Sequence, residues 1–166
     1  MTNKYLSILK KKWRKAGYGN LTIIIYKMGN FIHSKIKIPI LKQVLMLIYR
    51  ILDIVFIRIF ANSEVPYTTK IGKRLGLPHG GMGIIISGKS TIGDDVIIFH
   101  QVTIGTRVSE GKAPIIGNNV FIGAGAKILG DITIGDGSSI GANAVVLTDV
   151  PPHSTAVGIP AKIISN

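Results

Sequence analysis

An aliphatic residue recurs at every sixth position through the middle and C-terminal parts of the chain. The series comprises Ile92, Ile98, Ile104, Ile116, Ile122, Ile128, Ile134, Ile140 and Val146. A small or β-branched residue stands two positions before most of these aliphatics, and glycine directly follows six of them. A period of six fits neither an amphipathic helix nor an alternating strand, and a short fixed period is typical of a solenoid. Three hexads would form one triangular coil, so the pattern predicts about five to six stacked coils.

In such a coil, each aliphatic residue points into the interior and the small residue lets the chain turn a corner. Glycine is expected where the backbone needs a positive φ. One coil cannot bury its own interior face, so stability is expected from stacking of neighbouring coils. Alternating strands of a sandwich would not keep one register over roughly fifty residues.

Two segments interrupt the repeat. The stretch 106–113 is polar and contains Gly111, so it is expected to be a loop that leaves the register intact. Traced towards the N-terminus, the register slips by three residues between Leu77 and Ile86, at the sequence Pro-His-Gly-Gly-Met-Gly of residues 78–83. A glycine-rich irregularity in a regular solenoid is a candidate functional site, and His79 is its candidate side chain.

The first 61 residues have no six-residue repeat and are predicted to be a basic helical region. A shorter helix is expected over 18–34, Pro39 marks a break, and a long helix is expected over 42–60. On that long helix the polar residues fall within roughly half of the circumference and the other half is apolar. The charges argue against a membrane span, so an interfacial helix is expected, with the basic run Lys10–Lys15 as an electrostatic anchor. Residues 62–166 form the second predicted domain.

Charge is concentrated in the helical region. Residues 1–60 carry 12 Lys and Arg against one acid, Asp53, whereas residues 61–166 carry 8 against 7. The asymmetry points to a polyanionic surface, and the absence of an aromatic-interleaved basic motif favours a membrane over nucleic acid. The chain has no cysteine, which excludes disulfides and thiolate chemistry. Without an evident cleavable signal, the expected location is cytoplasmic, peripheral on the inner membrane face.

Four segments, taken together and in order, resemble the hexapeptide-repeat acyltransferases. These are Lys-Ile-Gly at 70–72, Leu-Pro-His-Gly at 77–80, Ile-Gly-Ala-Gly-Ala-Lys-Ile-Leu-Gly at 122–130, and the tail from Val150 to Ala161. They resemble serine O-acetyltransferases and, still more, capsular and exopolysaccharide O-acetyltransferases. The resemblance implies a mainly β fold, a left-handed parallel β-helix after the helical segment. It also implies a homotrimer and acetyl-CoA as co-substrate, with no metal.

The resemblance also implies site residues. His79 would be the general base that takes the proton from an acceptor hydroxyl, because imidazole exchanges protons near neutral pH. Glu64 stands where the family has a carboxylate that orients this histidine. Acetyl-CoA would lie between subunits against Gly105, Thr106, Ala124, Ala142 and Lys162.

The acceptor is predicted from two departures from the serine enzymes. Pro78 replaces an aspartate before the histidine, and Lys112-Ala113-Pro114 replaces an Arg-His-Pro. Loss of groups suited to an amino acid favours an uncharged sugar hydroxyl of a capsular polysaccharide or exopolysaccharide, or of its lipid-linked precursor. His100 and Lys112 are the candidate acceptor-binding residues.

The sequence leaves three alternative hypotheses for the function. The first is a serine O-acetyltransferase of cysteine biosynthesis, which shares the mechanism. The second is a β-helix carbonic anhydrase, which needs three histidines on zinc; His79, His100 and His153 are too far apart in the repeat, and His153 is expected to be structural. The third is a non-catalytic, membrane-bound scaffold.

Overall fold

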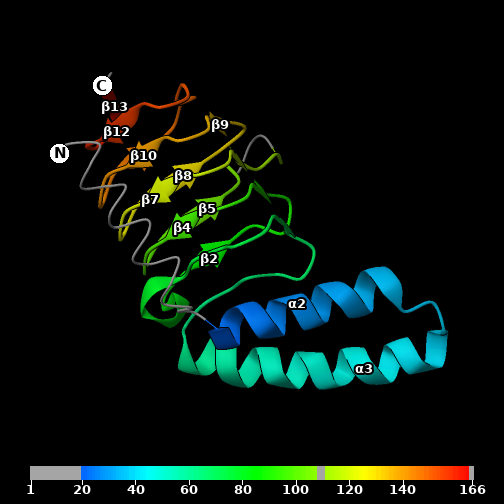
Figure 1. Ribbon diagram of the computed structural model, residues 1–166. Helices are drawn as coiled ribbons and strands as arrows, with labels where there is room; N and C mark the ends of the chain where they lie inside the picture. Colours follow the sequence, from blue (N-terminus) through cyan, green and yellow to red (C-terminus); the bar gives the residue numbers. More distant parts are fainter. Residues whose placement is uncertain (1–19, 108–110, 165–166) are drawn as a thin grey trace.

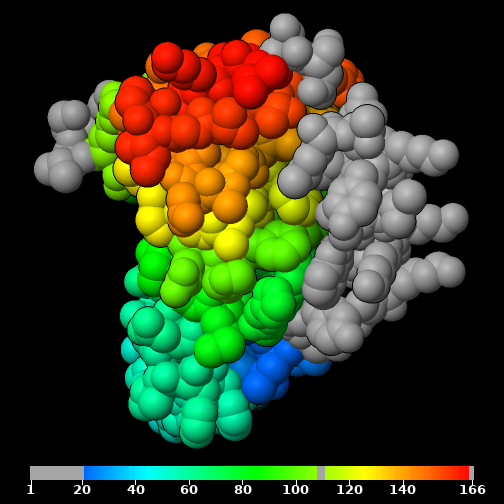
Figure 2. Space-filling view, turned by 90° about the vertical axis from the view of Figure 1, so that its left-hand side faces the viewer, coloured from blue at the N-terminus to red at the C-terminus, as the bar shows by residue number. Residues whose placement is uncertain are grey.

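The computed structural model describes residues 20–107 and 111–164. The predicted basic anchor Lys10–Lys15 lies outside these ranges. Helices occupy residues 20–60 and a three-sided parallel β-helix follows (Figure 1). The helices lie across one end of the coil stack, and the C-terminal strands lie at the other end (Figures 1 and 2).

The two predicted helices are present, with shifted bounds. Helix α2 spans Asn20–Lys35, α3 spans Pro39–Leu52, and the same helix continues as a π-helix, η1, over Asp53–Phe60. Pro39 stands in the first turn of α3, where its missing N–H is tolerated. Within η1, Nε of Arg58 donates to Oδ2 of Asp53 at 2.9 Å. The two residues are five apart in sequence, which matches the wider turn of a π-helix.

The β-helix has three faces. The first face holds β2 (Ile85–Ile86), β5 (Thr103–Gly105), β8 (Lys127–Leu129) and β11 (Val145–Val146). The second holds β1 (Lys70–Ile71), β3 (Thr91–Ile92), β6 (Ile115–Ile116) and β9 (Thr133–Ile134). The third holds β4 (Ile97–Ile98), β7 (Phe121–Ile122), β10 (Ser139–Ile140), β12 (Thr155–Val157) and β13 (Lys162–Ile164).

Neighbouring strands on each face are parallel, except that β13 folds back antiparallel on β12. Single bridges add Glu64 beside Ile85, Gly76 beside Ile97 and Val150 beside Ile134. With these bridges each face has a residue from every coil, which gives five coils over residues 64–157. The predicted number of coils is therefore confirmed.

The interior of the β-helix is a column of the predicted aliphatic residues. Each of the nine repeat positions from Ile92 to Val146 is at most 2% exposed. The preceding small residues, such as Val96, Val120 and Ala144, are buried as well. Stacking brings like positions together, for instance Ile98 beside Ile122, so each coil covers the open face of its neighbour.

The expected reason for the repeat glycines is wrong in part. Positive φ occurs three positions after the aliphatic residue, at Asp95 (58°) and Asn119 (56°) among others. Gly93, which directly follows Ile92, has no positive φ. A Cβ there would lie 2.7 Å from the carbonyl group of Gly117 on the next coil. Glycine is needed at this position because stacked coils approach one another closely.

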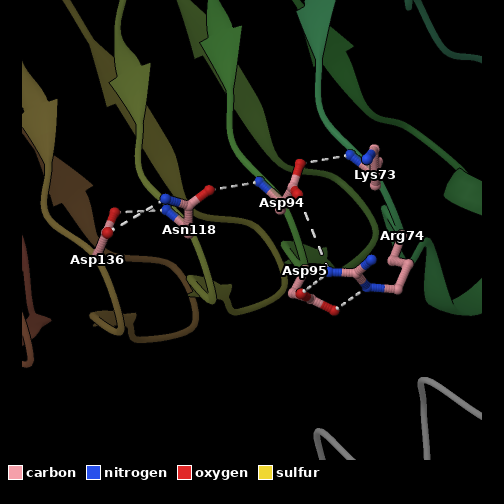
Figure 3. A network of polar contacts seen from close by, with 6 residues as sticks. All are labelled: Lys73, Arg74, Asp94, Asp95, Asn118 and Asp136. Carbon is pink, nitrogen blue, oxygen red and sulfur yellow. Dashed lines mark hydrogen bonds and ion pairs between the residues drawn. The ribbon is translucent and has the colours of Figure 1, made fainter.

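A ladder of polar side chains joins successive coils at one corner (Figure 3). Asp94 accepts the N–H of Lys73 at 2.7 Å, Asn118 accepts that of Asp94 at 2.8 Å, and Asp136 accepts that of Asn118 at 2.6 Å. The N–H bond from Asn118 holds the pKa of the Asp136 carboxyl below its ordinary value of 3.8. The ladder gives these corner amides partners on the neighbouring coil.

Candidate active site

His79 lies in a strained turn at the predicted slip in the repeat. The short helix η2 spans Pro78–Gly81, and inside it His79 (φ 61°, ψ 30°) and Gly80 (φ 73°, ψ 4°) leave the helical region. A non-glycine residue with left-handed backbone geometry costs free energy, and such strain clusters at functional sites. The turn exposes His79 at the surface.

Two buried hydroxyl groups hold this turn. Thr22 of α2 donates from Oγ1 to the carbonyl of Gly80 at 3.0 Å. Ser63 donates from Oγ to the carbonyl of Gly81 at 2.7 Å and accepts the N–H of Ile84 at 3.1 Å. Both residues are at most 4% exposed, so the turn is fixed from the helical region and from the first coil. In Figure 1 the turn is the short green coil beside the start of α2.

His79 lines an open cavity of about 760 Å³ along the first face of the β-helix. The cavity is bounded by residues from five segments: Ala61, Asn62, His79, Met82, Gly83, Ile85, His100, Gln101, Thr103, Gly125, Lys127 and Asn143. The volume suits a small ligand or one arm of a larger one.

A second histidine faces His79 in this cavity. The rings of His79 and His100 meet edge to face, with centroids 5.1 Å apart. Phe99 stands 6.1 Å from His79, also between ring centroids. Nδ1 of His100 is buried and has no hydrogen-bond partner among the residues that the structure describes, which is costly unless a ligand or water supplies one. The predicted proximity of His100 to the cleft of His79 thus agrees with the geometry.

Lys127 adds a positive charge to the same cavity. Its Nζ donates to the carbonyl of Gln101 at 2.7 Å. An ammonium group has three donors, so this bond leaves capacity for an anionic group of a ligand.

Glu64 lies in the first coil, where its backbone bridges to Ile85. Its carboxylate pairs with the guanidinium of Arg58 at 3.6 Å, and Glu64 is not among the residues that line the cavity. The orientation of His79 by Glu64 stays a prediction.

The predicted acetyl-CoA residues fall at two corners and the tail. Ala124 and Ala142 lie at one corner, where the carbonyl of Ala124 accepts the N–H of Asn143 at 2.8 Å. Their neighbours Gly125 and Asn143 line the cavity. Gly105 ends β5, with Thr106 after it at the next corner, and Lys162 begins the exposed strand β13. The two corners are therefore separated by the first face.

Lys112 lies in the loop between β5 and β6, pairs with Asp131 at 2.7 Å and is not among the cavity residues. Its predicted acceptor role stays a prediction. In the described ranges, no three His, Cys, Asp or Glu residues come together as metal ligands. His153 takes the positive-φ corner position (58°) and packs beside Gly137, as expected of a structural residue.

Sequence reasoning missed several cavity residues, among them Asn62, Gln101 and Asn143. All three have positive φ. Gln101 and Asn143 stand three positions after Ile98 and Ile140, so the corner position of the repeat was a usable signal for them. Asn62 lies before the repeat begins, and no comparable signal existed for it.

Comparison with known proteins agrees with the fold. The family described as "Bacterial transferase hexapeptide (six repeats)" matches residues 113–148. A serine acetyltransferase of Staphylococcus aureus is 51% identical over 109 residues, which are 64% of this chain and 51% of that protein. The chain thus spans about half the length of the curated relatives that it matches.

Solved structures of serine acetyltransferases share the architecture. The coenzyme A complex from Brucella abortus superposes with a TM-score of 0.74 at 31% identity, covering 87% of this chain and 55% of that one. The soybean enzyme complexed with serine gives 0.70 at 33% identity, covering 84% of this chain and 54% of that one. The fold and the repeat are similar to those of hexapeptide-repeat transferases. The chain matches that family over residues 113–148, the curated relative and the solved structures named above are serine acetyltransferases, and the predicted left-handed β-helix is confirmed.

These relatives overturn the predicted sugar acceptor. The capsular or exopolysaccharide assignment is wrong, because proteins 51% identical to this chain are serine acetyltransferases. The comparisons give the carbohydrate and membrane expectations no support. The error came from treating missing side chains at Pro78 and Ala113 as evidence about the ligand, although the cavity has polar groups of its own in His100 and Lys127.

Proposed function

We propose that this protein is an acetyl-CoA-dependent O-acetyltransferase whose acceptor is L-serine. The observation that carries the proposal is the strained His79 turn, which opens on a cavity in a β-helix similar to serine acetyltransferases. The relatives include a structure with coenzyme A and one with serine.

The chemistry follows from an imidazole beside a bound hydroxyl. His79 takes the proton of the serine hydroxyl as the oxygen attacks the thioester carbonyl of acetyl-CoA. The carbonyl oxygen becomes an oxyanion, and the tetrahedral intermediate then collapses with cleavage of the carbon–sulfur bond. The departing CoA thiolate receives the proton from imidazolium, so the base is regenerated and O-acetylserine leaves.

Polar groups in the cavity suit an amino-acid acceptor. The ammonium of Lys127 offers donors to a carboxylate, and His100 presents a buried Nδ1 that needs a partner. In this proposal Lys127 binds the carboxylate of serine and His100 helps to position the acceptor. Gly105, Thr106, Ala124, Ala142 and Lys162 belong to the acetyl-CoA side of the site.

The proposal includes a homotrimer with the site between subunits. Met82 and Ile85 beside the cavity are 55% and 41% exposed, and a neighbouring subunit would cover such apolar side chains. Sedimentation analysis should give three times the mass of one chain.

The test is the release of CoA thiol from acetyl-CoA, with L-serine, L-serine methyl ester or D-serine as acceptor. L-serine should give the highest kcat/KM, because only it combines the hydroxyl with a correctly placed carboxylate. Lys127→Met should raise the KM for L-serine by about ten-fold and leave the ester nearly unaffected, since one charge-assisted bond to a carboxylate is lost. No thiol release above hydrolysis with L-serine would contradict the proposal.

A further inference from the structure

An apolar stripe runs along the outward face of α3 into the first turn of η1, and Gln43 and Arg50 are exposed beside one edge of it. We use the name α3 stripe for the exposed apolar side chains that follow one another on this face. Its members and exposed fractions are Ile40 (77%), Val44 (52%), Leu47 (60%), Ile48 (48%), Ile51 (54%) and Ile54 (50%). At about 100° per residue they occupy an arc of roughly 120°.

Three polar side chains, Lys42, Tyr49 and Asp53, point away from the stripe. Tyr49 and Asp53 are buried and joined by a 3.3 Å hydrogen bond from Tyr49 Oη to Asp53 Oδ1. Lys42 donates from Nζ to the carbonyl of His33 at the end of α2. A surface helix of a globular protein normally has the opposite arrangement, with polar residues in water and apolar residues inward.

The stripe lies at the end of the molecule. Helix α2 packs between α3 and the β-helix, and α3 is the helix farther from the C-terminal strands (Figure 1). After the stripe, η1 ends in Ile59 and Phe60, which are 67% and 71% exposed. The chain then passes directly to Ala61 and Asn62 of the active-site cavity.

The charge around the stripe selects the partner. Residues 20–60 contain six Lys and Arg and a single acid. That acid, Asp53, is already paired with Arg58. Arg50 is exposed at the edge of the stripe, and Lys35 and Lys37 are exposed just before α3. A second copy of this surface would bring like charges together, whereas anionic lipid headgroups complement them.

From these observations we propose that the α3 stripe docks on an anionic lipid surface, with α3 lying in the plane of the interface. Apolar side chains enter the headgroup boundary, and the basic groups contact the phosphates. Among the helices of residues 20–107 and 111–164, none has the length and apolar character needed to cross a bilayer. The proposal does not depend on the identity of the acetyl acceptor, and a cytoplasmic location stays a prediction.

The test is vesicle flotation of the full chain at 0.1 M salt. Vesicles are made of phosphatidylcholine alone or with phosphatidylglycerol as one third of the lipid. Wild type should float with the anionic vesicles only. Leu47→Gln/Ile51→Gln should lower the partition coefficient by about ten-fold, because two side chains no longer gain from leaving water.

The matched control is Ile163→Gln/Ile164→Gln in β13, where the exposed fractions are 45% and 52%. This variant should float like wild type. Both double variants should keep the melting temperature and the wild-type rate of thiol release with L-serine, which separates this proposal from the proposed function.

Three results would overturn the docking proposal. The first is no flotation of wild type with anionic vesicles. The second is equal flotation of the stripe variant and wild type. The third is a halved assembly mass of the stripe variant in sedimentation without lipid, because the stripe would then be an interface between copies.

Discussion

The β-helix and the helical pair use the same aliphatic residues in opposite ways. In the β-helix, isoleucines of the repeat such as Ile98, Ile122 and Ile128 are fully buried, because each coil covers the next. In the helical pair, Ile25, Ile32 and Ile57 are buried, while Ile40 and Ile51 face outward. Two helices on the end of a stack can cover only one side of each other. In a repeat sequence, the next coil is always the packing partner of each apolar residue. The sequence of an amphipathic helix does not specify what covers its apolar face.

The largest expected effect comes from the column of the β-helix. Ile122→Ala should lower the free energy of unfolding by about 2–5 kcal/mol, because it leaves a cavity that neighbouring coils cannot fill. Ile51→Ala in the α3 stripe should change it by less than about 0.5 kcal/mol. Urea unfolding measures both. Similar losses for the two variants would mean that the two regions do not differ as described.

A smaller effect is expected from the stacked glycines. Gly93→Ala should cost about 1–3 kcal/mol, because the new methyl group meets the backbone of the adjacent coil. Gly76→Ala is the control: its Cβ would lie 3.5 Å from the Ile97 side chain, an ordinary contact. Melting temperatures of the two variants give the comparison, and equal values would contradict the close-approach explanation.

The smallest effect concerns pH and the corner ladder. The folded-state pKa of Asp136 is lowered by the N–H of Asn118, so its ionised carboxylate favours the folded state. This contribution is present above the ordinary carboxyl value of 3.8 and is lost as pH falls through the folded-state value. Urea midpoints measured from pH 6 downwards should therefore fall more steeply for wild type than for Asp136→Asn. Parallel curves would remove Asp136 from the acid dependence.

The sequence was sufficient to predict the β-helix, because every sixth side chain is a buried aliphatic residue. The slip at residues 78–83 was visible for the same reason, and it led to His79. The sequence was not sufficient to predict the role of Gly93, because that role depends on the distance to a coil 24 residues away. It also could not give the direction of the apolar face of α3, because the pattern from Ile40 to Ile54 is the same whether that face points inward or outward.

The acceptor could not be predicted from the sequence, for a different physical reason. Specificity depends on which polar groups converge on one cavity, and Lys127 and His100 come from neighbouring coils. Comparing Pro78 and Lys112 with a family pattern identified side chains that this chain lacks. It did not identify the polar side chains that line the cavity. The relatives with serine in their names corrected that inference.

The measurement that tests the central claim most directly compares two histidines with the same backbone geometry. His79 (φ 61°) and His153 (φ 58°) both occupy left-handed positions, which asparagine tolerates. With acetyl-CoA and L-serine, His79→Asn should lower kcat by about 10²–10⁴-fold with little change in the KM for acetyl-CoA. His153→Asn should keep wild-type kcat. A His79→Asn protein that is folded and turns over at the wild-type rate would contradict the assignment of His79 as the base.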